Sequence, residues 1–422
     1  MTKGKQMDIP FILQVTREIG LGGGSESVAF ELHRAWLALG VDARVLTSQV
    51  TEPDAEEGII LAATWLKNWG ANLRGRHLAM LVAVPLFTLI ASWRLWRSRG
   101  SKIVLSHGDS LVGDVCIVHS VNRACLAEKQ RMGSYAWLFN PINLWVAWRD
   151  SWMFGGKRYR RVVAISERVR RELKEHYHVP DDQIVTIPNG INLARFNPRN
   201  AKSRDEVRRS LGVPVDAPML LFVGSRYRIK GLRFAIMALA EMQTKAFLVI
   251  VGNDKVGRYK ALAEKLGVGD RVIFAGARSD LPKIYPAADA FVLPTLYETF
   301  ALVCLEAMAS GVPVVASPAG GIEDYLHDGV NGFHIRHDPP EIAAKLDRLL
   351  NDPELHARIR EAGLRTAGNY SWDTIAAQYL NLFAELVGER AGKMAFPVGQ
   401  PLWSTSAQGM AAPAPNISIQ GI

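Results

Sequence analysis

Cysteine is scarce in this 422-residue chain, which has three: Cys116, Cys125 and Cys304. They form no CxxC pair and are too scattered for a disulfide framework or a zinc site, so we predict reduced core thiols. The chain also lacks an Asp-x-Asp motif, so a divalent ion would be without its usual ligands, and it lacks the G-K-[ST] of a Walker A loop. We therefore predict no metal site and no cofactor.

A long apolar run of the kind that spans a bilayer is also missing from the candidate segment Leu78–Trp93. A span needs about 20 apolar residues, whereas this run is shorter, contains Pro85 and is flanked by arginines. Two interpretations stay open: a buried core helix, and an interfacial helix held by its basic flanks. The apolar part of the N-terminus is too short for a signal peptide, so we expect a cytoplasmic protein. Peripheral attachment to the inner face of the plasma membrane stays open as a second expectation.

What the chain does contain is a surplus of positive charge and enough apolar residues for two cores. Lys and Arg number 50 against 41 Asp and Glu, a net charge of +9, and 48% of the residues are hydrophobic. The charge favours anionic ligands or an anionic membrane surface. The length favours two domains.

Apolar strand-like runs alternate with helical stretches in both halves of the chain. Such runs are typical of parallel strands buried on both faces. They are, in the first half, 9–15, 43–47, 102–106, 115–120, 161–166 and 184–190, and in the second half 219–224, 247–252, 271–276, 290–295 and 312–317. The predicted fold class is α/β, with two Rossmann-like parallel-sheet lobes that face each other across a cleft.

Four segments follow from this rhythm. We predict an N-terminal lobe over 9–195, a C-terminal lobe over 196–370, a helix over 371–390 that crosses back to the first lobe, and a mobile tail over 391–422. The prolines around a short charged helix place the join near 192–218, and the tail is rich in Ala, Pro, Ser, Gln and Gly without sustained periodicity.

Residues 131–161 combine four tryptophans with a basic cluster at 157–161. Trp rings beside Lys and Arg suit the face of a membrane or of a lipid-linked acceptor. A helical hairpin packed on the lobe explains the same residues, and the two interpretations stay open.

A glycine loop, "EIGLGGGSES", lies between the first strand and the first helix. It does not match a dinucleotide fingerprint, because Ser25 takes the place of the last glycine and no acidic residue ends the next strand. Backbone N–H groups at a helix N-terminus still provide a site for an anion. A structural turn is the alternative, although three successive glycines exceed what a turn needs.

Two glutamates eight positions apart stand out in "LPTLYETFALVCLEAMASG". A helix beginning near Phe300 leaves Glu298 in the loop and places Glu306 about 12 Å further along the axis, a span comparable to a sugar-diphosphate-ribose. The N–H groups of Phe300, Ala301 and Leu302 lie between them and are free to receive a phosphate. Two simpler explanations stay open: Glu298 helps to cap the start of the helix, and Glu306 is exposed to solvent.

Arg226 and Lys230 follow the first strand of the second half. Their positive charges would balance the negative charges of a diphosphate. The carboxyl end of a strand is where sites of α/β proteins occur, which argues against ordinary surface residues. Fixed cations there neutralise the charge that develops on a departing diphosphate.

Together the Arg226/Lys230 pair, Glu298-x7-Glu306, "LGGGSES", "IPNGIN" and "SWDTIAAQYLNLF" resemble the retaining glycosyltransferases of family 4, which have the GT-B fold. The resemblance covers roughly residues 9–388 and is most specific in the second half. Within the family, the stretch from 251 to 295 is most similar to bacterial lipopolysaccharide-core glucosyltransferases.

The resemblance implies roles for individual residues. Glu306 would hold the ribose hydroxyls of the donor, Glu298 a hydroxyl of the transferred sugar, and Arg226 with Lys230 the diphosphate. The remaining implied positions are Gly23 and Gly24 on the same diphosphate, Arg278 at the nucleobase, and His119 near the donor sugar and the acceptor, with His107 as its competitor.

The expected reaction is therefore metal-independent transfer of a hexose, with retention, from a nucleotide diphosphate sugar to a lipid-linked or polysaccharide acceptor. UDP-glucose is favoured as the donor, and lipopolysaccharide or other cell-envelope glycan synthesis as the role. GDP-mannose suits every motif equally. An NAD(P)-linked oxidoreductase and a GT-B protein that binds sugar nucleotides without transfer are the rivals. A nucleic-acid partner is not expected.

Overall fold

The computed structural model describes residues 11–21, 24–52, 57–65, 76–98, 102–131, 133, 135 and 140–390, with backbone only for 76–80 and 390. The chain divides into two units, residues 10–379 and the chain ends 1–9 with 380–422. Of the second unit, the described part is the end of one helix. The predicted tail over 391–422 and the predicted site residue Gly23 lie outside the described residues.

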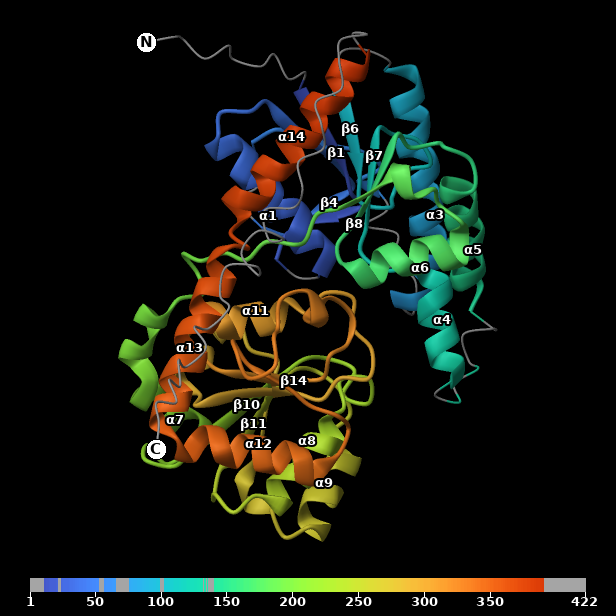
Figure 1. Cartoon of the computed structure of the whole chain (residues 1–422). Helices are drawn as coiled ribbons and strands as arrows, with labels where there is room; N and C mark the ends of the chain where they lie inside the picture. Colours follow the sequence, from blue (N-terminus) through green and yellow to red (C-terminus); the bar gives the residue numbers. More distant parts are fainter. Residues whose placement is uncertain are drawn as a thin grey trace, which may run out of the picture. The chain divides into compact units, whose positions relative to one another are not determined.

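The first half of the larger unit is built on a seven-stranded parallel sheet in the order β5-β3-β1-β6-β7-β8-β9 (Figure 1). All six predicted runs contribute a strand, and β5 is a seventh that the sequence pattern does not reveal. The strands are β1 Phe11–Val15, β3 Ala43–Thr47, β5 Ile59–Leu61, β6 Lys102–Ser106, β7 Val115–Val118, β8 Arg161–Ala164 and β9 Ile184–Thr186; β2 Glu18–Ile19 and β4 Gln49–Val50 form a separate pair.

The second half has a six-stranded parallel sheet in the order β12-β11-β10-β13-β14-β15. All five predicted runs are strands, and a short sixth one, β15, extends the edge. The strands are β10 Met219–Val223, β11 Phe247–Val251, β12 Val272–Gly276, β13 Ala290–Leu293, β14 Val314–Ala316 and β15 Phe333–His334. Two parallel-sheet α/β lobes are the predicted fold class, and the structure confirms it.

Helices cover both faces of each sheet (Figure 1), because right-handed crossovers between parallel strands place them there. In the first half they are α1 Gly24–Ala38, α3 Arg76–Arg97, α4 Asn122–Arg131, α5 Pro141–Phe154 and α6 Glu167–Tyr177. In the second half they are α7 Arg204–Leu211, α8 Leu232–Glu241, α9 Gly257–Lys265, α10 Leu281–Ile284, α11 Leu302–Ala309, α12 Pro339–Asn351, α13 Pro353–Gly368 and α14 Trp372–Arg390. Short 3₁₀ turns are η2 Asp181–Gln183, η3 Pro198–Ser203, η4 Gly269–Arg271, η5 Tyr285–Ala287 and η6 Gly320–Asp324.

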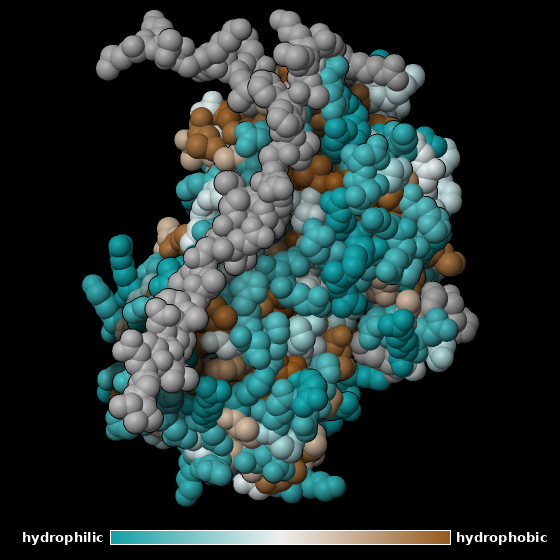
Figure 2. All heavy atoms as spheres, in the orientation of Figure 1, coloured by the Kyte–Doolittle hydropathy of each residue, from teal (hydrophilic) through white to brown (hydrophobic). Residues whose placement is uncertain are grey.

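Burial of the central strands supplies the core. Every residue of β6, β7 and β10 is buried, and each large apolar side chain removed from water contributes about 1.5–3 kcal/mol to folding. The face of the molecule seen in Figure 2 is mostly hydrophilic, with hydrophobic residues in small separate areas. Buried helix residues such as Trp36 and Phe87 complete the core around the strands.

Helix α3 contains the predicted apolar run and has two different faces. Phe87, Ala91 and Leu95 are buried in a cluster with strand residues of the first sheet. The opposite face exposes apolar side chains, among them Trp93 at 54% and Trp96 at 62%. The helix is therefore a core helix on one side and an apolar surface on the other. No helix among the described residues is long and apolar enough to cross a membrane.

Helix α14 begins next to the first lobe. The indole N–H of Trp36 on α1 donates to the carbonyl of Ala376 at 3.2 Å, and the rings of Trp36 and Tyr379 pack edge to face.

The segment that joins the lobes is anchored to the second lobe by Arg208 on α7. Its buried guanidinium pairs with Asp289 at 2.7 Å and also donates to three backbone carbonyls.

We predict that Arg208→Met lowers the free energy of unfolding by about 3 kcal/mol, because three backbone carbonyls lose a donor and Asp289 keeps only Arg204 as an ionic partner. Chemical denaturation measures the change. Arg209→Met is the matched control. The Arg209 side chain is 67% exposed, so its loss should change the free energy of unfolding little. Equal effects of the two substitutions would contradict the assigned role of Arg208.

Candidate functional site

The loop after β10 presents Arg226 to solvent. Tyr227 anchors the loop, because its amide donates to the Asp254 carboxylate at 2.7 Å and its hydroxyl to the Gly252 carbonyl at 3.0 Å. Arg226 itself has a left-handed backbone with φ of +57°, which is uncommon for a residue with a side chain. The side chain is exposed and lines a pocket.

Lys230 closes the same loop and forms an ion pair with Glu298, which lies in the loop after β13. Both side chains are largely buried, with exposed fractions of 14% and 13%. The other carboxylate oxygen of Glu298 accepts from the amide of Thr299 at 3.2 Å. Two residues predicted for different parts of a donor therefore contact each other directly.

The backbone around Glu298 rests on the glycine turn η6. The amide of Gly321 donates to the carbonyl of Thr299 at 3.1 Å. A Cβ on Gly320 would lie 1.9 Å from the carbonyl oxygen of Glu298, and Gly320 has a φ of +66°. Glycine at this position lets the two loops approach so closely.

The helix after Glu298 begins at Leu302, two residues later than the predicted start near Phe300. Ala301 is its N-cap in a left-handed conformation with φ of +58°, and Tyr325 donates to the carbonyls of both Phe300 and Ala301. The continuous helical spacing of the sequence does not reveal this break. Within the described part of the chain, no group accepts a hydrogen bond from the amides of Phe300, Ala301 or Leu302, which leaves these donors for an anion.

Glu306 contacts Tyr285, a partner that the sequence pattern does not reveal. The buried hydroxyl of Tyr285 donates to one carboxylate oxygen of Glu306 at 2.7 Å. Burial raises the pKa of Glu306, while this hydrogen bond and the charge of Arg195 oppose the rise. The contact fixes one carboxylate oxygen and leaves the other for a ligand.

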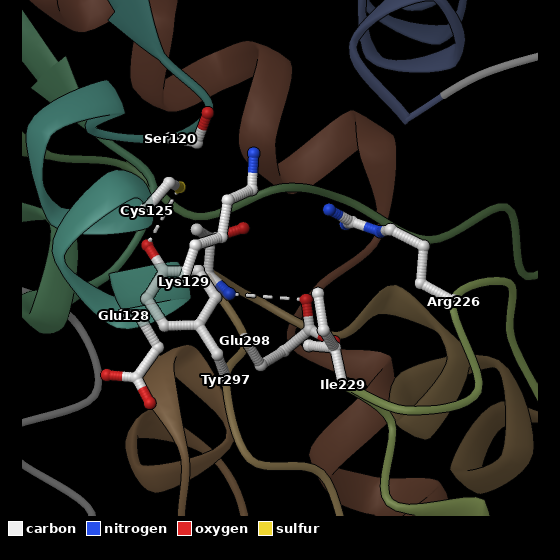
Figure 3. A pocket seen from close by; sticks show the side chains of 9 residues that line it. Ser120, Cys125, Glu128, Lys129, Arg226, Ile229, Tyr297 and Glu298 are labelled. Atoms are coloured by element: carbon white, nitrogen blue, oxygen red, sulfur yellow. Dashed lines mark hydrogen bonds between the residues drawn. The ribbon is translucent and has the colours of Figure 1, made fainter. Parts of the chain in front are cut away.

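A pocket of about 120 Å³ brings several of these residues together with side chains of the first lobe (Figure 3). From the second half come Arg226, Glu298 and the backbone next to it. The complete lining is Ser120, Cys125, Glu128, Lys129, Arg226, Ile229, Tyr297, Glu298 and Thr299. Glu306, Arg278 and the two histidines are not among the lining residues.

Tyr297 connects the two halves beside this pocket. Its hydroxyl lies 3.3 Å from the thiol of Cys125 on α4 and donates to Glu172 on α6 at 3.4 Å. The guanidinium of Arg168 lies 4.5 Å from the centre of the Tyr297 ring. These contacts hold the residue that directly precedes Glu298, and sequence alone gives no sign of them because the partners are more than 120 positions away.

The two candidate histidines, His107 and His119, contact each other. His107 follows β6 and His119 follows β7, and their ring nitrogens lie 3.1 Å apart with the rings stacked. The second nitrogen of His107 contacts Gln14 at 2.8 Å. Burial lowers the pKa of His107 well below its usual value and that of His119 to about 4.

Gly24 and Arg278 stand apart from the pocket residues. Gly24 begins α1, and among the described residues none outside its own helix and chain neighbours lies within 4 Å of a Cβ built on it. Arg278 forms two hydrogen bonds with Asp280, at 2.7 and 2.8 Å. Within the described ranges no cluster of three or more His, Cys, Asp or Glu side chains is placed to hold a metal ion.

Gly320→Ala should displace the Glu298 loop and lower the free energy of unfolding by about 2 kcal/mol or more, because the new Cβ collides with a backbone carbonyl. Gly329→Ala is the matched control, since Gly329 has a similar φ of +71° but open space around it. The control should show only the cost of the left-handed backbone, about 1–2 kcal/mol. Denaturation curves of the two variants measure the difference, and a larger loss for Gly329→Ala would refute the proposed collision.

The histidine pair makes stability depend on pH. Because the folded pKa of His119 is about 4 and its unfolded value is 6.5, the unfolded chain binds the proton more tightly, and stability is lost as the pH falls from about 7 to 4. His119→Asn should flatten this part of the stability curve, measured by urea unfolding at several pH values. His178→Asn, at an exposed histidine, should leave the slope unchanged.

Two family models match the chain. The model described as Glycosyltransferase Family 4 matches residues 22–195, and the model described as Glycosyl transferases group 1 matches residues 203–366. Together they cover both halves of the structure.

Curated relatives are similar to little more than half of the chain. An uncharacterized glycosyltransferase of Methanocaldococcus jannaschii is 36% identical over 231 residues, which cover 53% of this chain and 59% of the relative. A D-inositol 3-phosphate glycosyltransferase of Acidothermus cellulolyticus is 34% identical over 252 residues, 54% of this chain and 55% of the relative.

Solved structures agree over most of the length, at an identity that supports the fold alone. WaaG, a glycosyltransferase involved in lipopolysaccharide biosynthesis, has a TM-score of 0.70 at 22% identity and covers 88% of this chain and 99% of its own. Anabaena HepE in complex with UDP-glucose has a TM-score of 0.64 at 20% identity, covering 90% of this chain and 100% of its own.

Proposed function

The chain belongs to the GT-B glycosyltransferases, and we propose that it transfers a hexose from UDP-glucose to a lipid-linked or polysaccharide acceptor, with retention at the anomeric carbon. A role in lipopolysaccharide or other cell-envelope glycan synthesis follows as part of the proposal. The choice of donor follows the fold neighbour solved with UDP-glucose, and the choice of acceptor follows the neighbour involved in lipopolysaccharide biosynthesis. The relative named a D-inositol 3-phosphate glycosyltransferase points to a different acceptor.

The observation that carries the proposal is the Lys230–Glu298 pair, whose Glu298 lines the pocket together with Arg226. In the proposed complex, Glu298 accepts a hydrogen bond from a hydroxyl of the transferred sugar, and Lys230 with Arg226 binds the diphosphate. The backbone amides of Phe300, Ala301 and Leu302 donate hydrogen bonds to the same diphosphate. The oxygen of Glu306 that Tyr285 leaves open accepts from the ribose.

Catalysis then depends on stabilising the departing diphosphate. Lys230 is largely buried, and a fixed cation in such surroundings interacts more strongly with developing negative charge than it does in water. We assign no carboxylate as a nucleophile, and propose that the acceptor attacks from the face that the diphosphate leaves, with a phosphate oxygen taking the acceptor proton. The proposal needs no metal ion and no cofactor.

A donor screen tests the reaction. Purified protein is incubated with UDP-glucose, GDP-mannose and NADH, first without and then with glycan acceptors, and products are read by mass. UDP-glucose should bind and turn over, and Lys230→Ala should lower the rate on the order of 10²–10³-fold because it removes stabilisation of the leaving group.

Lys265→Ala, at an exposed lysine on α9, is the control for loss of a charge. Preferred turnover of GDP-mannose would replace the donor, and preferred binding of NADH would overturn the function. Activity that returns only with Mn²⁺ after chelation would overturn the metal-free mechanism. Substantial turnover by folded Lys230→Ala would refute the assignment of the cation.

We also propose that the protein works at the cytoplasmic face of a membrane. The outer faces of α3 and α5, two helices that contact each other, expose the apolar side chains Val82, Leu89, Trp93, Trp96, Leu144, Trp148 and Trp152. The guanidinium of Arg97 lies over the Trp93 ring and that of Arg158 over the Trp152 ring. Trp rings and arginines in this combination suit an anionic interface.

Vesicle co-sedimentation tests this surface. The wild-type protein should bind vesicles of phosphatidylglycerol and phosphatidylethanolamine more tightly than vesicles of phosphatidylcholine. Replacing Trp93 and Trp96 with serine should reduce binding about tenfold, because buried aromatic area and its contact with the bilayer interface are lost. Val330→Ser, at a 60% exposed valine of the second lobe, is the control, and equal binding by all three proteins would contradict the proposal.

A further inference from the structure

The pocket lining contains two cations and two carboxylates, and each carboxylate pairs with a cation outside the lining. Lys230 is paired with Glu298, and the other lining carboxylate, Glu128, lies 3.6 Å from Arg131. Arg226 and Lys129 form no ion pair with any residue that the structure describes. A cation in a partly enclosed pocket without a counter-charge attracts an anionic ligand.

These two cations come from different halves of the chain. Arg226 follows β10, whereas Lys129 lies on α4, which follows β7. Figure 3 shows the ammonium group of Lys129 and the hydroxyl of Ser120 at one end of the pocket, with the Glu298 carboxylate at the other. Ser120 is exposed and comes directly after His119. A cation and a hydroxyl donor therefore share the part of the pocket that the first lobe lines.

The position separates this pair from the donor residues. The proposed diphosphate ligands, Arg226 and Lys230, and the proposed sugar ligand, Glu298, all belong to the second half. A group that contacts Lys129 and Ser120 lies on the opposite wall, beyond the transferred sugar. The acceptor is the substrate that must approach the sugar from outside the donor.

We propose that Lys129 and Ser120 form an oxyanion subsite, and that the acceptor carries a phosphate ester or a carboxylate close to the hydroxyl that is glycosylated. This inference rests on the proposed function. Lys129 provides a charge-assisted hydrogen bond and Ser120 a second donor, and such bonds to an ionised group are about twice as strong as those between neutral groups. The subsite selects an anionic acceptor over a neutral one.

Isothermal titration calorimetry tests the subsite without knowledge of the acceptor. UDP is titrated first, and methyl phosphate or acetate is then titrated into the UDP-saturated protein. The wild type should bind one of the two anions, and Lys129→Gln and Ser120→Ala should each weaken that binding, the former about tenfold or more. The affinity for UDP should change less than twofold in both variants.

The outcomes separate the two proposals. Methyl phosphate binding in preference to acetate identifies a phosphate ester, and the reverse identifies a sugar acid; either supports the subsite. Failure of UDP-saturated wild type to bind either anion overturns the subsite alone, whereas failure to bind any nucleotide overturns the proposed function. If Lys129→Gln weakens UDP as much as the small anion, Lys129 belongs to the diphosphate site and the subsite is refuted. Lys265→Gln controls for the loss of one positive charge.

Discussion

The ion pair between Lys230 and Glu298 is the contact on which the candidate site depends. It joins the loop after β10 to the loop after β13, two neighbouring strands of the second sheet. Each residue is mostly buried and would be costly to leave alone in the protein. Because they satisfy each other, neither charge is left without a partner in the fold.

Other parts of the structure hold the pair in place. The glycine turn η6 lies directly against the backbone of Glu298, and Tyr297 is held by groups of α4 and α6. On the other side, Tyr227 fixes the loop that carries Arg226 and Lys230. The sheets thus provide the framework, and buried aromatic hydroxyls set the final positions of the charged groups.

The fold is largely readable from the sequence, because parallel strands buried on both faces are continuous apolar runs. The exceptions, β5 and β15, are edge strands of three and two residues, too short for such a pattern. The start of α11 differs for another reason: Ala301 adopts a left-handed backbone, although nothing in its chemistry signals a break. The charged residues of the candidate site also stand out in the sequence, but the groups that they contact do not. Tyr285, Tyr297 and Lys129 come close only through folding, and no local spacing encodes that.

Helix α4 supplies both the thiol that contacts Tyr297 and the ammonium group of Lys129. A single ten-residue element therefore supplies both a contact to the second half beside the pocket and a positive charge in the pocket lining. The groups proposed to act on the donor lie elsewhere in the chain. Under the proposed subsite, a change at Lys129 that leaves Cys125 and its contact with Tyr297 in place would redirect the protein toward a different acceptor, so the two specificities can diverge independently.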